Sequence, residues 1–436
     1  MLKNRLLPFL IVFLFLAFAV PGFFSYAQTA RDLQNKIEDK NAEIDKLEQE
    51  IKQYQGQLDT LGKQKSSLAG ALELLDITKK KLNADISVTQ NKIDKTNLKI
   101  EGLSKDIGTK ESSIGTATDA ISLEIKKTDE LEQESLIENI LAEDDFTLVW
   151  TDINNMATVR EKIRENILTL RQVKGQLEDT RQETIDAKNE LISLRAKLAD
   201  QKKIIDQNVS EKNKLLAETK NSEASYQKLL SDELVKKTAL EKEVSDYESQ
   251  LKYILDPKSL PKGGVLSWPL DSILITNLFG KNTSGIYASG LHNGVDFRAA
   301  IGTPVKAMAD GVVAGTGDTD LQCPRASFGR FVLIKYNNGL ASTFGHLSLI
   351  KTYKGAEVKR GDIVGYSGNT GYSTAAHLHV SVYARDAVDV QSLPSKSCPG
   401  RILTQPISPT NAYLDPLFYL PKATSDMYKS TLVRPD

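Results

Sequence analysis

The sequence contains four histidines, and all of them lie in its C-terminal part: His292, His346, His377 and His379. Two of them flank Leu378 in the strand-like run AAHLHVSVYA. Side chains at positions i and i+2 of a strand point to the same face of a sheet. Both imidazoles of the His377-Leu378-His379 segment can therefore enter one site, while Leu378 packs into the core.

A second pair of candidate ligands is His292 and Asp296, in the segment GLHNGVDFRA. Gly294 lies between them and permits a turn that can bring both side chains to one centre. With one histidine of the His377-Leu378-His379 segment they make a set of two imidazoles and one carboxylate. Three protein ligands with an open fourth position are what a catalytic zinc ion requires.

The same type of ligand set leaves a second metal open, because two histidines and one carboxylate also bind the iron of non-haem oxygenases. Whichever histidine of the His377-Leu378-His379 segment is the ligand, two further histidines remain, and they favour hydrolysis. They supply groups that can transfer a proton or stabilise an oxyanion. A bound zinc ion would lower the pKa of its water and polarise the scissile carbonyl.

These residues lie in a region whose short apolar runs alternate with Gly, Asn and Asp, which is typical of strands and turns. Asn338-Gly339 separates two apolar runs and strongly indicates a β-hairpin. We expect a mostly antiparallel β domain over residues 265–422, followed by a tail over 423–436. The breaker-rich segment 257–264, with two prolines and two glycines, is predicted to be a linker that could act as a hinge.

Residues 28–256 have a different sequence pattern, in which apolar residues recur every seven positions. The first series is Ile37, Ile44, Ile51, Leu58; a later one is Ile86, Ile93, Ile100, Ile107; a third is Ile163, Leu170, Leu177, Leu191, with polar Thr184 in its seam. A seven-residue repeat keeps one seam facing a partner helix, as in a coiled coil. We expect an antiparallel hairpin with arms of about 95 residues each; a parallel homodimer is the alternative, because periodicity does not identify the partner.

The repeat breaks at residues 131–157, where apolar residues including Phe146 and Trp150 are dense and irregular. This segment is predicted to form one or two short helices at the tip of the hairpin. It either caps the hairpin by local packing or docks another protein, because an exposed apolar patch often marks an interaction site.

Composition narrows the class of protein further. The chain has 436 residues, a formal net charge of -1 and two cysteines, so bulk attraction to nucleic acid is not indicated. Residues 1–27 read as a signal peptide: Lys3 and Arg5 precede an apolar run, and Ser25-Tyr26-Ala27 offers a cleavage site. An uncleaved membrane anchor is the alternative. Both predict an extracytoplasmic protein, in the periplasm, in the cell wall or secreted.

The C-terminal region resembles the lysostaphin/LytM-type zinc endopeptidases. The matching pieces, in the family's order, are SWPL, ITNLFG, HNGVD, GTPVKAMADGVV, GRFVLIKYNNGLASTFGHLS and VKRGDIVGYSGNTGYSTAAHLHV. The resemblance implies that His292, Asp296 and His379 bind zinc. It also implies that His346 and His377 are the catalytic pair, and that the substrate is a peptide of bacterial peptidoglycan.

Several positions depart from the family pattern. Phe344 stands where the family usually has Tyr, Ala375-Ala376 where it has Gly-Pro, and Val380-Ser381 where it has Phe-Glu. Two insertions, around residues 318–327 and 390–410, carry one cysteine each. Outside the cytoplasm we expect a Cys323–Cys398 disulfide to join them; two buried free thiols are the alternative.

The rod resembles the coiled coils of EnvC-like cell-division factors, which bind a membrane FtsEX-type transporter and carry a LytM domain without metal ligands that activates amidases. The predicted fold is therefore an α+β multidomain chain, with an antiparallel coiled-coil hairpin followed by a LytM-type peptidase domain. The predicted function is a zinc endopeptidase for peptidoglycan cross-links in wall remodelling or division, restrained by its coiled coil until a membrane partner engages it. A non-enzymatic amidase activator is the alternative, and the intact His and Asp set favours the enzyme. Oligomeric state is left open.

Overall fold

The structure is a computed structural model that describes residues 21–61, 67–132, 146–251, 260–281, 291–325, 327–373, 375–430 and 432. Several expectations fall partly outside these ranges: most of the signal segment, the centre of the tip at 133–145, the end of the coiled-coil region at 252–256, linker residues 257–259 and the last four residues. Residues 21–27, at the end of the expected signal segment, belong to the first turns of a helix. Within the described ranges, no helix combines the length and the apolar character needed to cross a membrane.

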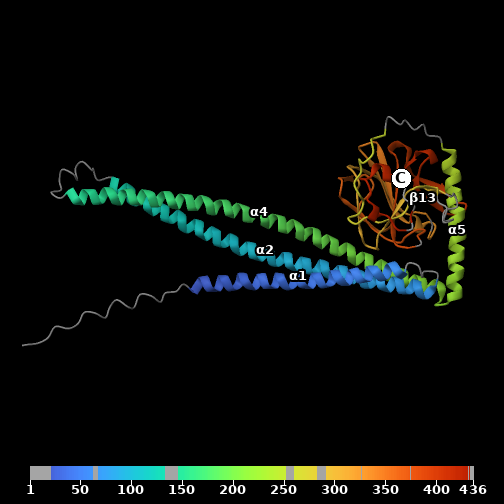
Figure 1. Cartoon of the computed structure of the whole chain (residues 1–436), viewed down its shortest axis with the longest axis horizontal. Helices are drawn as coiled ribbons and strands as arrows, with labels where there is room; N and C mark the ends of the chain where they lie inside the picture. Colours follow the sequence, from blue (N-terminus) through green and yellow to red (C-terminus); the bar gives the residue numbers. More distant parts are fainter. Residues whose placement is uncertain are drawn as a thin grey trace, which may run out of the picture. The chain divides into compact units, whose positions relative to one another are not determined.

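Four long helices make up the N-terminal part of the chain, drawn in blue to yellow-green in Figure 1: α1 (Pro21–Leu61), α2 (Leu68–Glu132), α4 (Phe146–Thr219) and α5 (Glu223–Gln250). Helices α2 and α4 have 65 and 74 residues, fewer than the about 95 residues expected for each arm. The second arm breaks at Lys220 and Asn221, which have φ angles of 50° and 57°. Residues 146–157 form the start of α4 and not a separate short helix at the tip.

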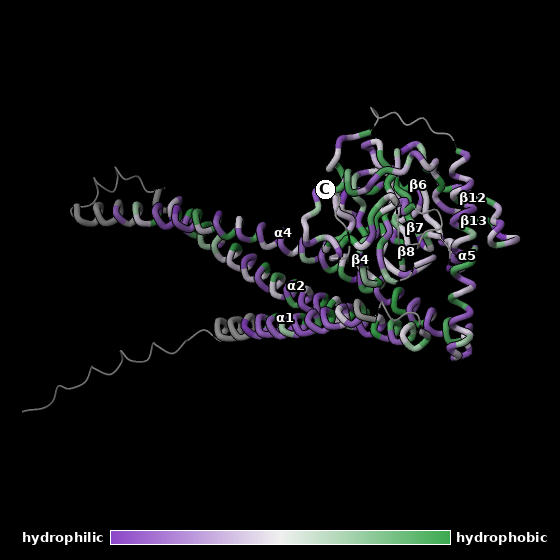
Figure 2. The backbone as a smooth tube through the Cα atoms, turned by 45° about the vertical axis from the view of Figure 1, so that its right-hand side comes forward, coloured by the Kyte–Doolittle hydropathy of each residue, from purple (hydrophilic) through white to green (hydrophobic). Residues whose placement is uncertain are grey.

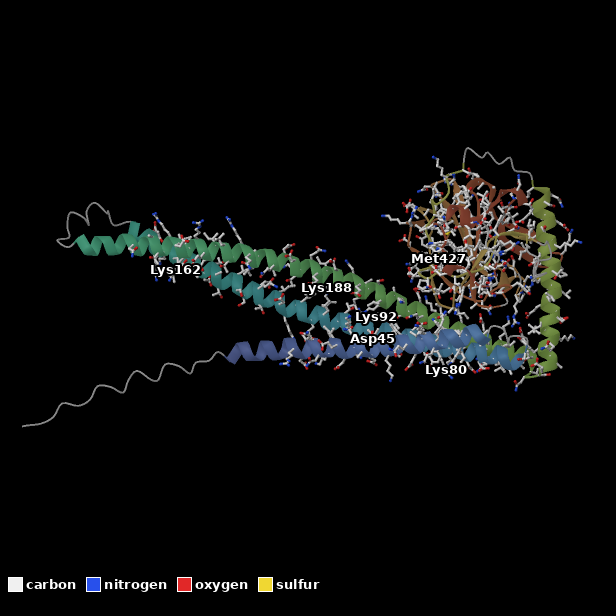
Figure 3. All side chains as sticks on the ribbon, viewed as in Figure 1. Asp45, Lys80, Lys92, Lys162, Lys188 and Met427 are labelled. Atoms are coloured by element: carbon white, nitrogen blue, oxygen red, sulfur yellow. A yellow bond between two sulfur atoms is a disulfide. The ribbon has the colours of Figure 1, made fainter. Side chains whose placement is uncertain are left out.

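Helices α2 and α4 pair antiparallel within one chain, as the hairpin hypothesis predicts. In the unit that contains Ser87–Leu198, the Arg181 guanidinium donates to Glu111 at 2.9 Å and the Asn166 amide to Glu124 at 3.1 Å. As the residue number rises along α4 from Asn166 to Arg181, the number of the partner in α2 falls from Glu124 to Glu111, so the two helices run antiparallel. Charged tips cover the outside of these helices (Figure 3).

The polar seam position is accommodated inside α4. Thr184 is only 6 % exposed, and its hydroxyl donates to the carbonyl oxygen of Thr180 at 2.8 Å. Helix α1 also lies against α2, in the opposite direction, because Lys40 donates to Asn91 and Leu33 lies beside Gly102. The first arm of the sequence-based prediction is therefore two helices that fold back on each other.

Helix α5 does not continue the coiled coil but packs along the β-rich domain, next to β12 and β13 in both Figure 1 and Figure 2. Leu240 is 1 % exposed and belongs to a cluster with Cys323 and Leu403. Glu243 accepts hydrogen bonds from the backbone N–H groups of Lys396 and Ser397, at 2.7 and 2.9 Å. The heptad-like pattern of α5 thus buries its apolar face against the C-terminal domain.

The C-terminal domain is mostly antiparallel β, as predicted. Its strands are β1 (Ile275–Asn277), β2 (Gly280–Lys281), β3 (Leu291–His292), β4 (Val295–Arg298), β5 (Pro304–Lys306), β6 (Gly311–Asp318), β7 (Arg330–Tyr336), β8 (Leu340–Ile350), β9 (Glu357–Val358), β10 (Ile363–Ser367), β11 (His377–Ala384), β12 (Asp389–Pro394), β13 (Ile402–Ile407) and β14 (Tyr413–Leu414). Short helices interrupt them at Thr319–Leu321, Arg385–Ala387, Thr410–Ala412, Pro416–Tyr419 (α6) and Ser425–Met427, which includes the Met427 labelled in Figure 3.

The main sheet runs in the order β1-β4-β11-β8-β7-β6-β9, with β10 attached to β8, β5 attached to β10 and β14 attached to β11. Asn337, Asn338 and Gly339 close the β7–β8 hairpin, and Gly339 has a φ of 87°. Figure 2 shows the hydrophobic residues concentrated among these strands. The core beneath the sheet includes Phe297, Phe344 and Leu378, each 0 % exposed. Strand β11, which carries the His-Leu-His segment, therefore lies in the middle of the sheet.

The two insertions are joined covalently. Cys323 and Cys398 form a disulfide with a Cα–Cα distance of 6.0 Å, as we expected outside the cytoplasm. The second insertion forms the separate β12–β13 hairpin. Gln322 also accepts a hydrogen bond from the backbone N–H of Thr404 at 2.7 Å. The disulfide thus ties this hairpin to the turn at Thr319–Leu321, near the edge of the catalytic face.

Candidate functional site

Sheet pairing brings the predicted ligands together. In the β4–β11 ladder His379 lies opposite Asp296, and in the β11–β8 ladder it lies opposite Gly345. Leu378, between the two histidines of β11, is 0 % exposed in the core, whereas His377 and His379 face the site. The same-face prediction for the two histidines is confirmed.

His292, Asp296 and His379 are the group of residues, within the described ranges, whose side-chain atoms can hold one metal ion. His292 Nε2 lies 3.2 Å from His379 Nδ1 and 3.3 Å from Asp296 Oδ1, and His379 Nδ1 lies 2.9 Å from Asp296 Oδ1. Ligands about 2.0–2.1 Å from a tetrahedral zinc ion are roughly 3.3 Å apart. The three atoms are therefore spaced like one face of a tetrahedral site.

Hydrogen bonds on the far sides of both rings set the tautomers. His292 Nδ1 lies 2.8 Å from the carbonyl oxygen of Leu278, which can only accept, so this nitrogen carries the proton. His379 Nε2 lies 2.9 Å from Ser381 Oγ and donates to it when Nδ1 is the ligand atom. Such outer partners orient the ligands of a metal site. With His379 Nδ1 as a ligand atom, three lone pairs are directed toward one centre, where a cation can bind.

The carboxylate of Asp296 is held in its charged form. Burial alone would raise the pKa of Asp296, but the neighbouring His377 and His292, with hydrogen bonds from the site, hold this pKa well below its usual value. Asn277 donates to Asp296 Oδ2 at 3.2 Å and leaves Oδ1 for the site. Burial lowers the pKa of His379, so its imidazole stays neutral and able to bind a metal.

His346 lies beside the three ligands, at the end of the β8 segment that faces β11. Its Nδ1 lies 2.8 Å from the carbonyl oxygen of Thr370 and must donate to it, so Nε2 keeps a free lone pair. Its backbone N–H donates to the carbonyl oxygen of Phe328 at 2.7 Å, and its φ is 59°, a left-handed value rare for a residue with a side chain. Burial lowers the pKa of His346 well below its usual value, so the ring is neutral near pH 7.

His377 completes the cluster. Its ring centroid lies 4.6 Å from that of His346, and its Nε2 lies 3.6 Å from Asp296 Oδ1. Its Nδ1 donates to the carbonyl oxygen of Ala375 at 2.8 Å and lies 3.0 Å from Ser373 Oγ. The structure thus brings together all five predicted site residues, with His377 the most accessible of the histidines that surround Asp296, at 17 % side-chain exposure.

Gly294 has a different role from the one expected. Its φ is not among the positive values, so the turn does not depend on left-handed backbone. A Cβ atom at Gly294 would lie 2.6 Å from His379 Cε1 and 2.6 Å from the carbonyl oxygen of Val380. The glycine is needed because the His379 ring occupies the space that a side chain would fill.

Sequence reasoning missed the residues that orient the ligands. Asn277 lies in the ITNLFG piece, but an amide on an edge strand gives no signal by itself. Ser381 was noted only as a departure from the family pattern, yet its hydroxyl is the partner of His379. Its position two residues after His379 in a strand, on the same face, was the available signal. The contribution of Thr370 is a backbone carbonyl, which no residue type reveals.

The domain that carries this site is similar to known peptidases. Residues 290–391 match Peptidase family M23. The DD-carboxypeptidase/endopeptidase Mpg of Neisseria meningitidis is 37 % identical over 119 residues, which cover 27 % of this chain and 26 % of that protein. The peptidoglycan DD-endopeptidase ShyA of Vibrio cholerae is 44 % identical over 94 residues, 22 % of this chain and 20 % of that protein.

Among solved structures, the catalytic domain of lysostaphin from Staphylococcus simulans is 36 % identical to the chain. The match covers 26 % of this chain and 81 % of that domain, with a TM-score of 0.24. The chain thus spans about a quarter of the length of the two curated relatives above, and the shared part is the β domain. This β domain is therefore a Peptidase family M23 domain, with lysostaphin among its relatives.

Proposed function

We propose that the chain is a zinc-dependent endopeptidase that hydrolyses peptide cross-links of bacterial peptidoglycan. The observation that carries this proposal is the convergence of three ligand atoms, from His292, Asp296 and His379, with two further histidines beside them. The names of the relatives, which are peptidoglycan endopeptidases, support the substrate class.

His346 is the group that we assign to proton transfer. A zinc ion held by the three ligands would supply Lewis-acid activation of a water molecule and of the scissile carbonyl. The His346 ring is neutral, and Thr370 fixes its tautomer, so Nε2 can accept a proton from the attacking water. A neutral base next to the reaction centre is what general base catalysis requires.

His377 is assigned to stabilising the developing oxyanion. The Ala375 carbonyl binds its Nδ1–H, and its side chain is 17 % exposed. In the imidazolium form, in which both ring nitrogens carry protons, its Nε2–H can donate to the substrate oxygen as negative charge develops there. Its restraint by Ser373 and Ala375 keeps the ring in place without a metal bond.

The alternative, a non-enzymatic amidase activator, is disfavoured by the same geometry. A domain that only binds a partner has no need for three ligand atoms with oriented tautomers. The hydrogen bonds of Leu278, Ser381 and Asn277 add to this argument, because they orient the three ligand side chains and form no part of an exposed binding surface.

Restraint by the coiled coil is part of the proposal. In the unit formed by Leu47–Ile86 and Ala199–Asp436, Leu82 of α2 and Ile204 of α4 are each 1 % exposed and cluster with Ile301 and Tyr366 of the M23 domain. Ala376, the residue before His377, packs against the same cluster. The base of the rod therefore touches the segment that carries one of the two proposed catalytic residues.

Polar contacts reinforce this docking. The Tyr366 hydroxyl donates to Asp200 Oδ2 at 3.1 Å, and Lys351 forms an ion pair with the same oxygen at 2.6 Å. Asp200 is 4 % exposed, so its carboxylate is shielded from water, whereas the Lys351 side chain is 37 % exposed. Release of these contacts would free the surface around Ala376 for substrate.

Export and partner binding are proposed on sequence grounds alone. The apolar N-terminal segment and the disulfide suit an extracytoplasmic protein. The likeness of the rod to EnvC-like factors supports a role in division, with a membrane FtsEX-type transporter as the activating partner. A ligand shifts such an equilibrium only by binding the released state more tightly.

The decisive experiment is digestion of purified peptidoglycan by the zinc-loaded chain, with mass spectrometry of the fragments. An Ile204→Ala variant is digested in parallel, because docking of the rod could slow the unmodified chain. We expect new peptide termini at cross-links, and none with His379→Ala. Absence of cleaved cross-links in both zinc-loaded samples would contradict the proposed activity.

A further inference from the structure

The turn that follows β6 packs backbone to backbone on the loop that precedes β11. Gly329 and Gly371 face each other, with φ angles of 63° and 66°. A Cβ atom on Gly329 would lie 2.3 Å from the Gly371 nitrogen, and one on Gly371 would lie 2.2 Å from the Gly329 nitrogen. The Tyr372 N–H donates to the carbonyl oxygen of Ser327 at 3.0 Å. The two segments are therefore one packed unit.

Asp320 holds these two segments together through two backbone N–H groups. Its Oδ2 accepts from Gly371 at 2.8 Å, and its Oδ1 accepts from Arg325 at 2.6 Å. Its own N–H donates to Asp318 Oδ1 at 3.0 Å, in the turn at Thr319–Leu321. Charge-assisted bonds of this kind are stronger than neutral ones. Asp320 therefore fixes the loop that contains Gly371.

The Gly371 N–H belongs to the same peptide group as the Thr370 carbonyl. That carbonyl oxygen accepts the Nδ1–H of His346 at 2.8 Å. Because a peptide group is planar, its N–H and C=O directions are coupled. The Asp320 carboxylate on one end and the His346 ring on the other are therefore joined through one rigid peptide group.

This peptide group could otherwise rotate. Glycine at Gly371 accepts both signs of φ, and rotation of the preceding peptide converts one turn type into another. A rotated peptide would turn the Thr370 carbonyl away from His346 Nδ1. The Thr370 hydroxyl anchors only the side chain, by accepting from the Arg330 N–H and donating to the Leu347 carbonyl. Apart from packing, the Asp320 contact is the polar restraint on the Gly371 N–H.

We propose that Asp320 is a positioning residue for His346: it holds the Thr370–Gly371 peptide group in the orientation that keeps His346 as the Nδ1–H tautomer, with Nε2 free. The effect of Asp320 on hydrolysis rests on the proposed peptidase function. Its effect on the His346 tautomer does not rest on that function, so an experiment can contradict one claim and leave the other standing. A negative carboxylate at the N–H end also polarises the peptide group and strengthens the carbonyl as an acceptor.

The test uses the full chain, loaded with zinc and labelled with ¹⁵N histidine; four histidines give a spectrum in which each ring can be assigned by substitution. The variants are Asp320→Ala and the volume-matched Asp320→Asn, which keeps one carbonyl oxygen as an acceptor. Arg325→Ala is the matched control, because it changes the same turn and leaves the backbone N–H that Asp320 binds.

In the unmodified chain and in Arg325→Ala we expect His346 to be a single Nδ1–H tautomer. In Asp320→Ala we expect a mixture of both His346 tautomers, with the signals of His292 and His379 and the zinc content unchanged. In Asp320→Ala, kcat for hydrolysis should fall at least tenfold while KM stays within twofold. Asp320→Asn should recover part of the kcat and part of the Nδ1–H tautomer population of His346.

Two results would overturn the proposal. One is an unchanged His346 tautomer in Asp320→Ala. The other is an equal disturbance of all four histidines with loss of zinc, which would assign Asp320 a purely structural role. If Asp320→Ala does not fold, Asp320→Asn decides: a His346 ring identical to that of the unmodified chain counts against the proposal. If the unmodified chain does not hydrolyse peptidoglycan, the tautomer result still decides the role of Asp320.

Discussion

His292 Nε2 lies 3.2 Å from His379 Nδ1, and neither nitrogen carries a proton when the far sides of both rings donate to Leu278 and Ser381. Asp296 adds a carboxylate oxygen at 2.9 Å from His379 Nδ1. Three electron-rich atoms this close repel one another without a positive ion between them. The geometry therefore leads to direct predictions on metal content.

The purified chain should contain one zinc ion, and His379→Ala should contain none, because the variant leaves two of three ligands. Ser381→Ala should keep all three ligands but bind zinc about 10–100-fold more weakly, since it loses the partner that orients His379. Elemental analysis and competition with a chelator measure both effects. Stoichiometric zinc in His379→Ala would contradict the ligand assignment.

His346→Ala and His377→Ala should retain zinc and lose turnover by about 10²–10⁴-fold, because both side chains act on protons and charge and not on the metal. Cleavage of cross-linked peptidoglycan, measured at equal zinc occupancy, checks this. Cleavage close to that of the unmodified chain in either variant would show that its role is assigned wrongly.

The contact between α5 and the M23 domain should depend on pH through Glu248. This side chain is 3 % exposed, and burial raises its pKa to about 7, against hydrogen bonds from Tyr413 and the Ser408 N–H that lower it. The folded state thus holds a proton that the unfolded chain releases near pH 4.5. The contribution of Glu248 to the free energy of unfolding is fully present below pH 4.5. It is lost as pH rises through about 7, by at most about 3 kcal/mol.

Glu248→Gln tests this dependence. Both hydrogen bonds go to Oε1, which glutamine retains, and the variant cannot ionise. Tyr413 and Tyr383, the titratable groups nearby, have raised pKa values and stay neutral in this range. Thermal unfolding should show Glu248→Gln more stable than the unmodified chain at pH 8, with the two converging toward pH 4.5. A difference that does not vary with pH would contradict the assignment.

Loss of the disulfide should destabilise the M23 domain. Cys323 and Cys398 are 75 residues apart in sequence, so the bond restricts a long loop in the unfolded chain. Replacement of both by serine should lower the free energy of unfolding by about 2–4 kcal/mol. Urea unfolding measures this, with the reduced unmodified chain as a second sample. Identical unfolding midpoints for all three samples would show that the bond adds nothing.

Weakening the rod base should increase hydrolysis. Ile204→Ala removes a side chain that is 1 % exposed against Ile301 and Tyr366, at a cost of about 2–4 kcal/mol to the docked state. We expect several-fold faster cleavage at equal zinc occupancy. Ile192→Ala, on the same helix but 67 % exposed, is the matched control. Equal rates for both variants would mean that the rod does not restrain the site.

The sequence predicted the site well because strand geometry is local. The alternation in His377-Leu378-His379 determines which side chains share a face, and pairing of β11 with β4 places Asp296 opposite His379. Only the first pattern can be read along the chain. Asp296 and His379 are 83 positions apart, and the resemblance to the lysostaphin/LytM-type endopeptidases, not the strand pattern, placed them in one ligand set. The contact of Asp320 with Gly371 could not be read, because it joins distant turns through a backbone N–H.

The helical part was predicted less well. Heptads identify an apolar seam but neither the partner nor the continuity of the helix. Lys220 and Asn221 end α4 without a proline or glycine, so the break had no strong signal. Leu240 continues the apolar pattern and yet packs against Cys323 and Leu403 of the M23 domain. A seam looks the same in sequence whether a helix or a sheet covers it.

Strand β11 has a consequence for how this domain can diverge in evolution. It pairs with β4 and β8 along its length and with β14 near its end, so its register is fixed from both sides. A deletion or insertion of one residue would turn Leu378 toward the metal ligands and His379 into the core. Lineages can therefore exchange side chains along this strand, as Ser381 illustrates, but length changes must fall in the loops on either side.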